Sequence, residues 1–231
     1  MFGRDRSKVI REFYEVEVGP EEIALVHMDY SALLVKLRDK VLAFDVADLL
    51  GRKEVAEIRK LDYLLFTHDH YDHYNKEATL ALYEAATPKI IAPDTIYDDI
   101  KGEIPVYKIS GGESIAVDEL KVTGIEGKHV GPIVLYLLEV GGVKLFHGGD
   151  SGYVPLREYR ADVAFVPTGK PSPTASPNDA YQMVMDLEPS LIVPIHGAKS
   201  QHEDFKAKVE RALPEARVLI VEKWKVEKAT I

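Results

Sequence analysis

The six-residue segment His68-Asp69-His70-Tyr71-Asp72-His73 places three imidazoles and a carboxylate in the pattern His-x-His-x-Asp-His. With eight histidines in the chain, random placement gives this pattern with odds on the order of one in a thousand. At a strand end, residues two apart point the same way, so His68 and His70 can bind one metal ion. As the chain turns toward a helix, Asp72 and His73 can reach a second ion. Imidazole and carboxylate suit zinc and harder first-row metals, so the segment predicts a metal site.

Three further side chains that can bind a metal follow predicted strands elsewhere in the chain. His129 and Asp150 each lie in a loop after a predicted strand, and His196 closes the apolar run 191–195. Binding and catalytic residues are concentrated in such loops. We therefore expect these three residues to complete a site for two ions.

The elements that must position these residues alternate between strands and helices. Apolar or β-branched runs bounded by turn residues predict strands at 13–18, 23–28, 32–37, 41–46, 63–66, 106–109, 114–117, 120–125, 133–140, 143–146, 162–166, 191–194 and 217–221. Helices are predicted at 53–60, 76–86, 177–187 and 202–212, with Asn75 and Ser176 as N-caps and Gly141-Gly142 as a hairpin turn. Strand-rich blocks interleaved with helices predict an α/β fold, a four-layer αββα sandwich, with residues 1–231 as a single domain.

With these motifs in this order, the sequence resembles the metallo-β-lactamase superfamily over nearly its whole length. The resemblance implies the αββα sandwich of that superfamily and a two-metal hydrolase. It implies that one metal is held by His68, His70 and His129, that the other is held by Asp72, His73 and His196, and that Asp150 bridges them.

Within that superfamily the chain is similar to the branch of ascorbate-6-phosphate lactonase-like hydrolases. The turn Gly149-Asp150-Ser151-Gly152 matches a Gly-Asp-Thr-Gly-like turn of that branch. Asp162, Pro167-Thr168-Gly169 and Thr174 match its later motifs, but Ala175 stands where that branch carries Met. This departure leaves the substrate open and leaves the metal ligands intact.

Three residues are weaker candidates for supporting the ligands or the substrate. His147 could orient a metal ligand without binding the ion itself, or it could be a histidine at a strand end whose hydrogen bonds are made locally. Asp45 could hydrogen-bond a metal-binding histidine, or could simply terminate its strand. Lys170 could contact an anionic substrate, although most exposed lysines have no specific role.

Four other residues near the motifs receive a structural interpretation. His27 alternates with apolar neighbours and is expected to be structural. His202, at a predicted helix start, is expected to be exposed. Tyr71 and Tyr74 flank the metal motif and could line a pocket, but aromatic packing is the expectation for both.

The expected chemistry is hydrolysis by a hydroxide that bridges two divalent metal ions, zinc first, with manganese or iron as alternatives. The bond would be an ester, lactone or phosphodiester in a small anionic molecule, with Asp72 as the catalytic residue that orients the nucleophile and relays its proton. An RNA or DNA nuclease is an alternative, but such enzymes usually add a large domain. A di-iron oxygen reductase usually has Glu where this chain has His70. A metal-binding protein without activity is the non-enzymatic alternative.

Composition narrows the partners and the compartment. The 231 residues carry a formal net charge of −9, which disfavours attraction to nucleic acid or to an anionic membrane. The chain has no cysteine, so thiolate metal sites and disulfides are excluded. We expect a cytoplasmic protein that acts on a small molecule and does not engage a membrane; a homo-oligomer is compatible with the sequence. The scarcity of Asn and Gln beside many Lys and Glu favours a thermophilic source.

Overall fold

The computed structural model describes residues 4–231, and the chain divides into two compact units. The first unit comprises Met1–Lys108 and Val221–Thr230, and the second comprises Ile109–Ile220 with Ile231. Each unit has its own β-sheet and its own cluster of buried apolar side chains.

The first unit is built on a seven-stranded sheet in the order β14-β1-β2-β3-β4-β5-β6. Its strands are β1 (Glu22–His27), β2 (Leu33–Leu37), β3 (Lys40–Phe44), β4 (Tyr63–Leu65), β5 (Lys89–Ala92), β6 (Val106–Lys108) and β14 (Val226–Thr230). The sheet is antiparallel from β14 to β3 and parallel from β3 to β6. Because parallel strands end at the same edge, Asp45 after β3 and the segment from His68 after β4 share one edge.

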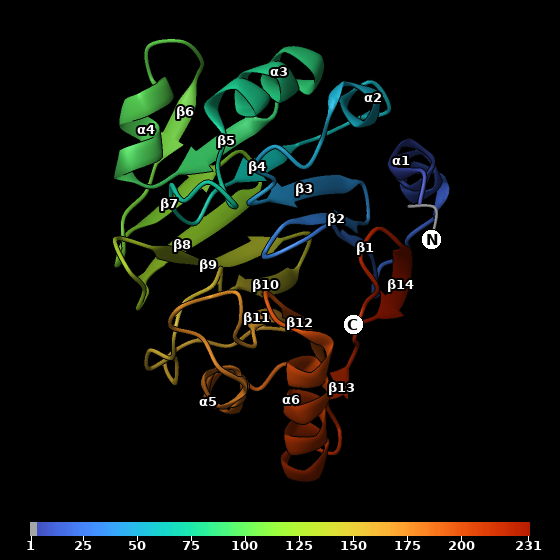
Figure 1. Ribbon diagram of the computed structural model, residues 1–231, viewed down its shortest axis with the longest axis vertical. Coiled ribbons are helices and arrows are strands. Elements are labelled where there is room, and N and C mark those ends of the chain that lie inside the picture. Colours follow the sequence, from blue (N-terminus) through green and yellow to red (C-terminus); the bar gives the residue numbers. More distant parts are fainter. Residues whose placement is uncertain (1–3) are drawn as a thin grey trace. The chain divides into compact units, whose positions relative to one another are not determined.

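Four helices lie along one face of this sheet (Figure 1). They are α1 (Arg6–Glu15), α2 (Arg52–Val55), α3 (Lys76–Ala86) and α4 (Asp94–Ile100). The Asn75 side chain accepts a hydrogen bond from the Ala78 N–H at 2.9 Å, which confirms the predicted N-cap of α3.

The predicted strand at 13–18 is wrong, because Phe13 belongs to helix α1. The side chain of Asp5 accepts a hydrogen bond from the Lys8 N–H and caps this helix. Val9, Ile10 and Phe13 recur at helical spacing and are all buried, so α1 packs this stripe toward β1 and β14. The helix predicted at 53–60 is also shorter than expected, since α2 ends at Val55.

The second unit is built on another seven-stranded sheet, in the order β13-β12-β11-β10-β9-β8-β7. Its strands are β7 (Ser114–Val117), β8 (Leu120–Glu126), β9 (Val134–Val140), β10 (Val143–His147), β11 (Val163–Pro167), β12 (Leu191–Ile195) and β13 (Arg217–Val218). Gly141 and Gly142, with φ of 59° and 82°, form the predicted hairpin turn between β9 and β10. The pairs from β10 to β13 are parallel, so Asp150 and His196 follow strands at one edge of this sheet.

Two helices pack on the second sheet, α5 (Pro177–Leu187) against β11 and α6 (Lys199–Ala212) against β12 and β13 (Figure 1). Ser176 caps α5 as predicted, with its side chain accepting from the Asp179 N–H. Two mixed sheets flanked by helices confirm the predicted fold class. Within residues 4–231, no helix combines the length and the apolar character needed to cross a membrane.

Candidate metal centre

The predicted metal ligands of the first unit are His68, His70, Asp72 and His73, and we call them the first ligand set. They begin three residues after the end of β4. The His70 carbonyl accepts hydrogen bonds from the N–H groups of His73 and Tyr74, each at 2.9 Å, and this folds the segment into a tight turn. The ring centroids of His70 and His73 lie 4.4 and 4.1 Å from that of His68. Ligand atoms of His68 lie within 4.8 Å of those of His70 and of His73. The turn therefore gathers the predicted ligands of this segment.

Asp45 supports this set from within the sheet. Its carboxylate is fully buried and accepts hydrogen bonds from the Thr67 N–H at 2.7 Å and the Thr67 hydroxyl at 2.8 Å. Its Oδ2 also lies 3.0 Å from His73 Nδ1. Asp45 adopts a left-handed φ of 47°, a conformation that aspartate tolerates better than most residues. Of the two interpretations from sequence, the structure favours the contact with a ligand histidine.

The second ligand set, His129, Asp150 and His196, lies in the second unit. Asp150 Oδ2 lies 3.4 Å from His129 Nε2 and 3.6 Å from His196 Nε2. The side chains of all three residues are almost completely buried. His196 has a φ of 43° directly after β12, a strained position for a non-glycine residue and a kind of strain often found at functional sites. Two imidazole nitrogens thus converge on one carboxylate oxygen.

The loop at residues 170–175 holds this second set in place. Ser172 Oγ donates to the Asp150 carbonyl at 2.6 Å and accepts from the N–H groups of Thr174 and Ala175, each at 3.3 Å. Thr174 Oγ1 lies 3.3 Å from the same carbonyl and 3.1 Å from His129 Nδ1. Sequence reasoning assigned no role to Ser172, since a serine between two prolines carries no ligand-binding signal of its own.

His147 and Lys170 take different places. His147 is buried and its Nδ1 accepts a hydrogen bond from the Gly149 N–H at 3.2 Å, so it supports the turn that carries Asp150. Lys170 follows Gly169 and is exposed. Its contact with an anionic substrate stays a prediction.

Three tyrosines lie near the first ligand set. Tyr71 is 84 % exposed, so the expected aromatic packing is wrong for it, whereas Tyr74 does pack edge-on against Phe66 with ring centroids 5.3 Å apart. Burial raises the pKa of Tyr30, and electrostatic interactions with Asp29, Tyr71 and Asp72 raise it further. The Tyr30 phenol therefore interacts with Asp72, and sequence reasoning did not single out this residue.

Two other histidines lie outside both ligand sets. His27 is buried in β1 with Nε2 2.9 Å from the Tyr30 carbonyl, which agrees with a structural role. His202 is only 6 % exposed within α6, so its predicted exposure is wrong. The cause is that α6 begins at Lys199, which places His202 in its first turn facing Gly197.

The donor chemistry of the two sets fits divalent metal ions. Together they offer five imidazoles and two carboxylates and no thiolate, a set that suits zinc, manganese or iron. Two donors about 2.1 Å from a tetrahedral zinc are about 3.4 Å apart. The separations of 3.4 and 3.6 Å around Asp150 Oδ2 match this spacing.

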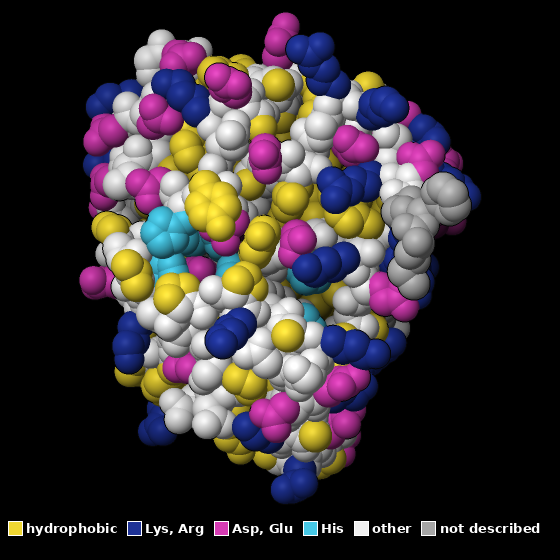
Figure 2. Space-filling model, in the orientation of Figure 1, with side chains coloured by type: hydrophobic (Ala, Val, Ile, Leu, Met, Phe, Trp, Pro, Cys, Tyr) yellow, Lys and Arg dark blue, Asp and Glu magenta, His cyan; other side chains and the backbone are white. Residues whose placement is uncertain are grey.

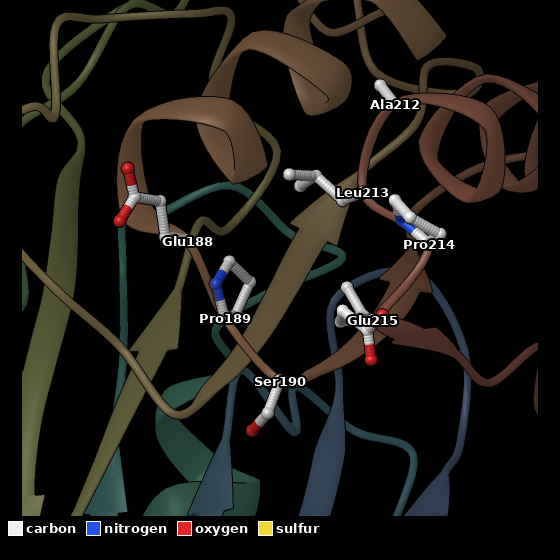
Figure 3. A pocket seen from close by; sticks show the side chains of 8 residues that line it. Glu188, Pro189, Ser190, Ala212, Leu213, Pro214 and Glu215 are labelled. Carbon is white, nitrogen blue, oxygen red and sulfur yellow. The ribbon is translucent and has the colours of Figure 1, made fainter.

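A separate pocket in the second unit, of about 310 Å³, is lined by the C-terminal ends of α5 and α6 and the segments after them (Figure 3). Glu188, Pro189, Leu213 and Pro214 are among its lining residues. Pro189 precedes β12, whereas His196 follows it, so the pocket and the ligand lie at opposite ends of this strand. The pocket is thus distinct from the second ligand set.

Comparison with known proteins supports the family assignment. Residues 43–197 match the family model described as the beta-lactamase superfamily domain, and this span contains both ligand sets. The chain belongs to the metallo-β-lactamase superfamily. It is 32 % identical over 163 residues to a UPF0173 protein of Pyrococcus furiosus, an alignment that covers 67 % of this chain and 76 % of the relative.

Other similar proteins cover more of the chain at lower identity. A UPF0173 metal-dependent hydrolase of Caldivirga maquilingensis is 26 % identical, with 84 % of this chain and 92 % of the relative aligned. The solved structure of Igni18, a metallo hydrolase from Ignicoccus hospitalis, superposes with a TM-score of 0.77 at 21 % identity. The superposition covers 91 % of this chain and 99 % of Igni18, which shows that the two proteins share a fold.

Proposed function

We propose that this superfamily member is a hydrolase whose two ligand sets together bind two divalent metal ions, zinc in the first instance. Its substrate would be a small anionic molecule with an ester, lactone or phosphodiester bond. The observation that carries the proposal is the convergence of His129 and His196 on one oxygen of Asp150 at the spacing of zinc ligands. The naming of relatives as metal-dependent hydrolases supports it.

The proposed assignment of ligands follows the resemblance of the motifs. One ion would be held by His68, His70 and His129, the other by Asp72, His73 and His196, with Asp150 shared. Within the first unit His68 lies beside both His70 and His73, and Asp72 lies beside His73, so this division rests on the resemblance and the geometry is compatible with it. His73 Nε2 is 3.7 Å from Asp72 Oδ2, again near the spacing of two ligands of one ion.

When bound, the two ions would supply an activated hydroxide and would stabilise the negative charge that develops on the substrate. Asp72 is the residue we assign to proton transfer. Its carboxylate is 14 % exposed, whereas the side chain of its neighbour His73 is fully buried. Asp72 can therefore reach a substrate from solvent while it contacts the ligand set, as a general base must.

Charge favours a small substrate over a polynucleotide. Basic and acidic side chains are interspersed on the face shown in Figure 2, where histidine side chains also reach the surface. The net charge of −9 gives no overall attraction to a phosphate backbone. A small anion can still be bound, because divalent ions reverse the local charge. The Gly149–Gly152 turn resembles that of lactonase-like hydrolases, but Ala175 departs from their pattern, so lactones, esters and phosphodiesters all stay candidates. Lys170 is the candidate for an added anion contact.

The test is turnover by purified protein loaded with zinc or manganese, on panels of lactones, esters and phosphodiesters. We expect metal-dependent turnover that chelation abolishes and that Asp150→Ala loses. Asp69→Asn is the matched control, because Asp69 lies in the same motif but is exposed and outside the ligand set. Metal-loaded protein that turns over no member of these panels would overturn the proposal.

A further inference from the structure

The hydroxyl of Thr174 lies within hydrogen-bond distance of both the Asp150 carbonyl and the ring of His129. A hydroxyl has one proton, and the Asp150 carbonyl, 3.3 Å from Thr174 Oγ1, can only accept. His129 Nδ1 lies 3.1 Å from the same oxygen. Both contacts can be hydrogen bonds only if Thr174 donates to the carbonyl and accepts from His129 Nδ1–H. In neutral His129 the lone pair then lies on Nε2, the atom 3.4 Å from Asp150.

Thr67 stands in the same relation to His68 in the first unit. Thr67 Oγ1 donates to the Asp45 carboxylate at 2.8 Å and lies 3.0 Å from His68 Nδ1. Since an ionised carboxylate only accepts, the hydroxyl must accept from His68 Nδ1–H. Thr67 is fully buried and Thr174 is half-buried, so water has limited access to either hydroxyl. This favours the hydrogen bonds described above over bonds to solvent.

We infer that Thr67 and Thr174 are positioning residues: their hydroxyls hold His68 and His129 in the Nδ1–H tautomer and aim each Nε2 lone pair at a metal ion. The tautomer claim stands on hydrogen-bond geometry alone, and its consequence for metal binding rests on the proposed function. The two residues therefore act on the two histidines assigned to one ion, each from its own unit. His73 differs, because its Nδ1 faces the Asp45 carboxylate instead of a hydroxyl.

The direct test is ¹⁵N NMR of the histidine rings in metal-free wild-type protein at about pH 8, where an ordinary histidine is neutral. Two-bond ¹H–¹⁵N correlations distinguish the Nδ1–H and Nε2–H forms. We expect His68 and His129 in the Nδ1–H form. The Nε2–H form at both residues would overturn the inference, and this result needs no variant and no bound metal.

Variants then test the consequence for the metal. Thr67→Val and Thr174→Val should each weaken zinc binding about 10- to 100-fold in competition with a chelating indicator. Thr67→Ser and Thr174→Ser keep the hydroxyl and should restore both the affinity and the Nδ1–H signal. Thermal unfolding of each metal-free variant checks folding separately. Unchanged zinc affinity in both folded Val variants would contradict the positioning role, whereas absence of zinc binding in wild type would contradict the proposed function.

Discussion

Asp45 joins two segments of the first unit through one buried carboxylate. A buried charge is tolerated only when donors surround it, and Asp45 has the Thr67 N–H, the Thr67 hydroxyl and His73 Nδ1 around it. A carboxylate behind an imidazole fixes the ring and makes its other nitrogen a stronger metal donor. We therefore predict that Asp45 contributes to metal binding without being a ligand.

We expect Asp45→Asn to weaken metal binding about 10- to 100-fold, because the amide carries no charge and brings donors toward existing donors. Zinc competition against a chelating indicator measures this. Asp39→Asn, at an exposed aspartate of the same unit, is the control and should leave the affinity unchanged. Equal affinities for both variants would mean that Asp45 is only a strand-terminating residue.

Asp72 and Asp69 allow a matched comparison inside one motif. We expect Asp72→Asn to lower kcat at least about 100-fold, the usual effect of losing a general base. Asp69→Asn should stay close to wild type, since Asp69 is exposed and lies outside the ligand set. Steady-state kinetics on the best substrate of the panel, with metal content measured in parallel, distinguishes the two. A wild-type kcat for Asp72→Asn would remove its catalytic role.

At the scale of elements, helix α5 anchors the segment that follows Asp150. Asp186 of α5 accepts hydrogen bonds from the Tyr153 hydroxyl at 2.8 Å, the Leu156 N–H at 3.0 Å and Arg157 Nε at 3.1 Å. Burial alone would raise the pKa of Asp186, but these three donors outweigh it and leave the pKa below its ordinary value. The helix is thereby fastened to the loop between β10 and β11.

This shift predicts a pH dependence of stability. Because the folded-state pKa of Asp186 is depressed, its contribution is present above the pKa of an unfolded aspartate, about 3.9, and is lost as pH falls through the lower folded value. Asp186→Asn should therefore be less stable than wild type at neutral pH, and the difference should shrink below about pH 4. Urea unfolding across pH measures it. Curves that stay parallel into acid would contradict the role of Asp186.

Elements with a strong local pattern could be predicted from the sequence. The runs after which the ligands lie, at 63–66 and 191–194, are buried strands, and Asn75 and Ser176 cap the helices that they were predicted to cap. Strand β5 was missed because it is four residues long and lies between Pro88 and Pro93. Strand β14 was missed because its charged residues and edge position weaken the apolar signal.

The site could be predicted in part for a related reason. Histidine and aspartate at strand ends are recognisable as candidate metal ligands from residue type and position alone. The supporting residues Thr67, Ser172 and Thr174 are not recognisable in this way, since each acts through a single hydroxyl with a partner distant in sequence. The sequence is compatible with two interpretations of Asp45, and its contact with His73 distinguishes them.

At the scale of the molecule, each unit has its own apolar cluster and its own share of the predicted metal ligands. Ions bound by both sets would lower the free energy of the folded state only, by about 4 kcal/mol for an ion at a thousand times its dissociation constant. For a chain of this size, we expect chelation to lower Tm by about 10 °C and zinc to restore it. Calorimetry with and without chelator measures this. A Tm that chelation leaves unchanged would argue against tight metal binding.

Anomalous diffraction at the zinc edge, on crystals of the protein grown with zinc, tests the central claim most directly. We predict two strong peaks, each contacted by side chains from both ligand sets, with Asp150 contacting both. Peaks confined to one set, or none near His68, His129 and His196, would contradict it.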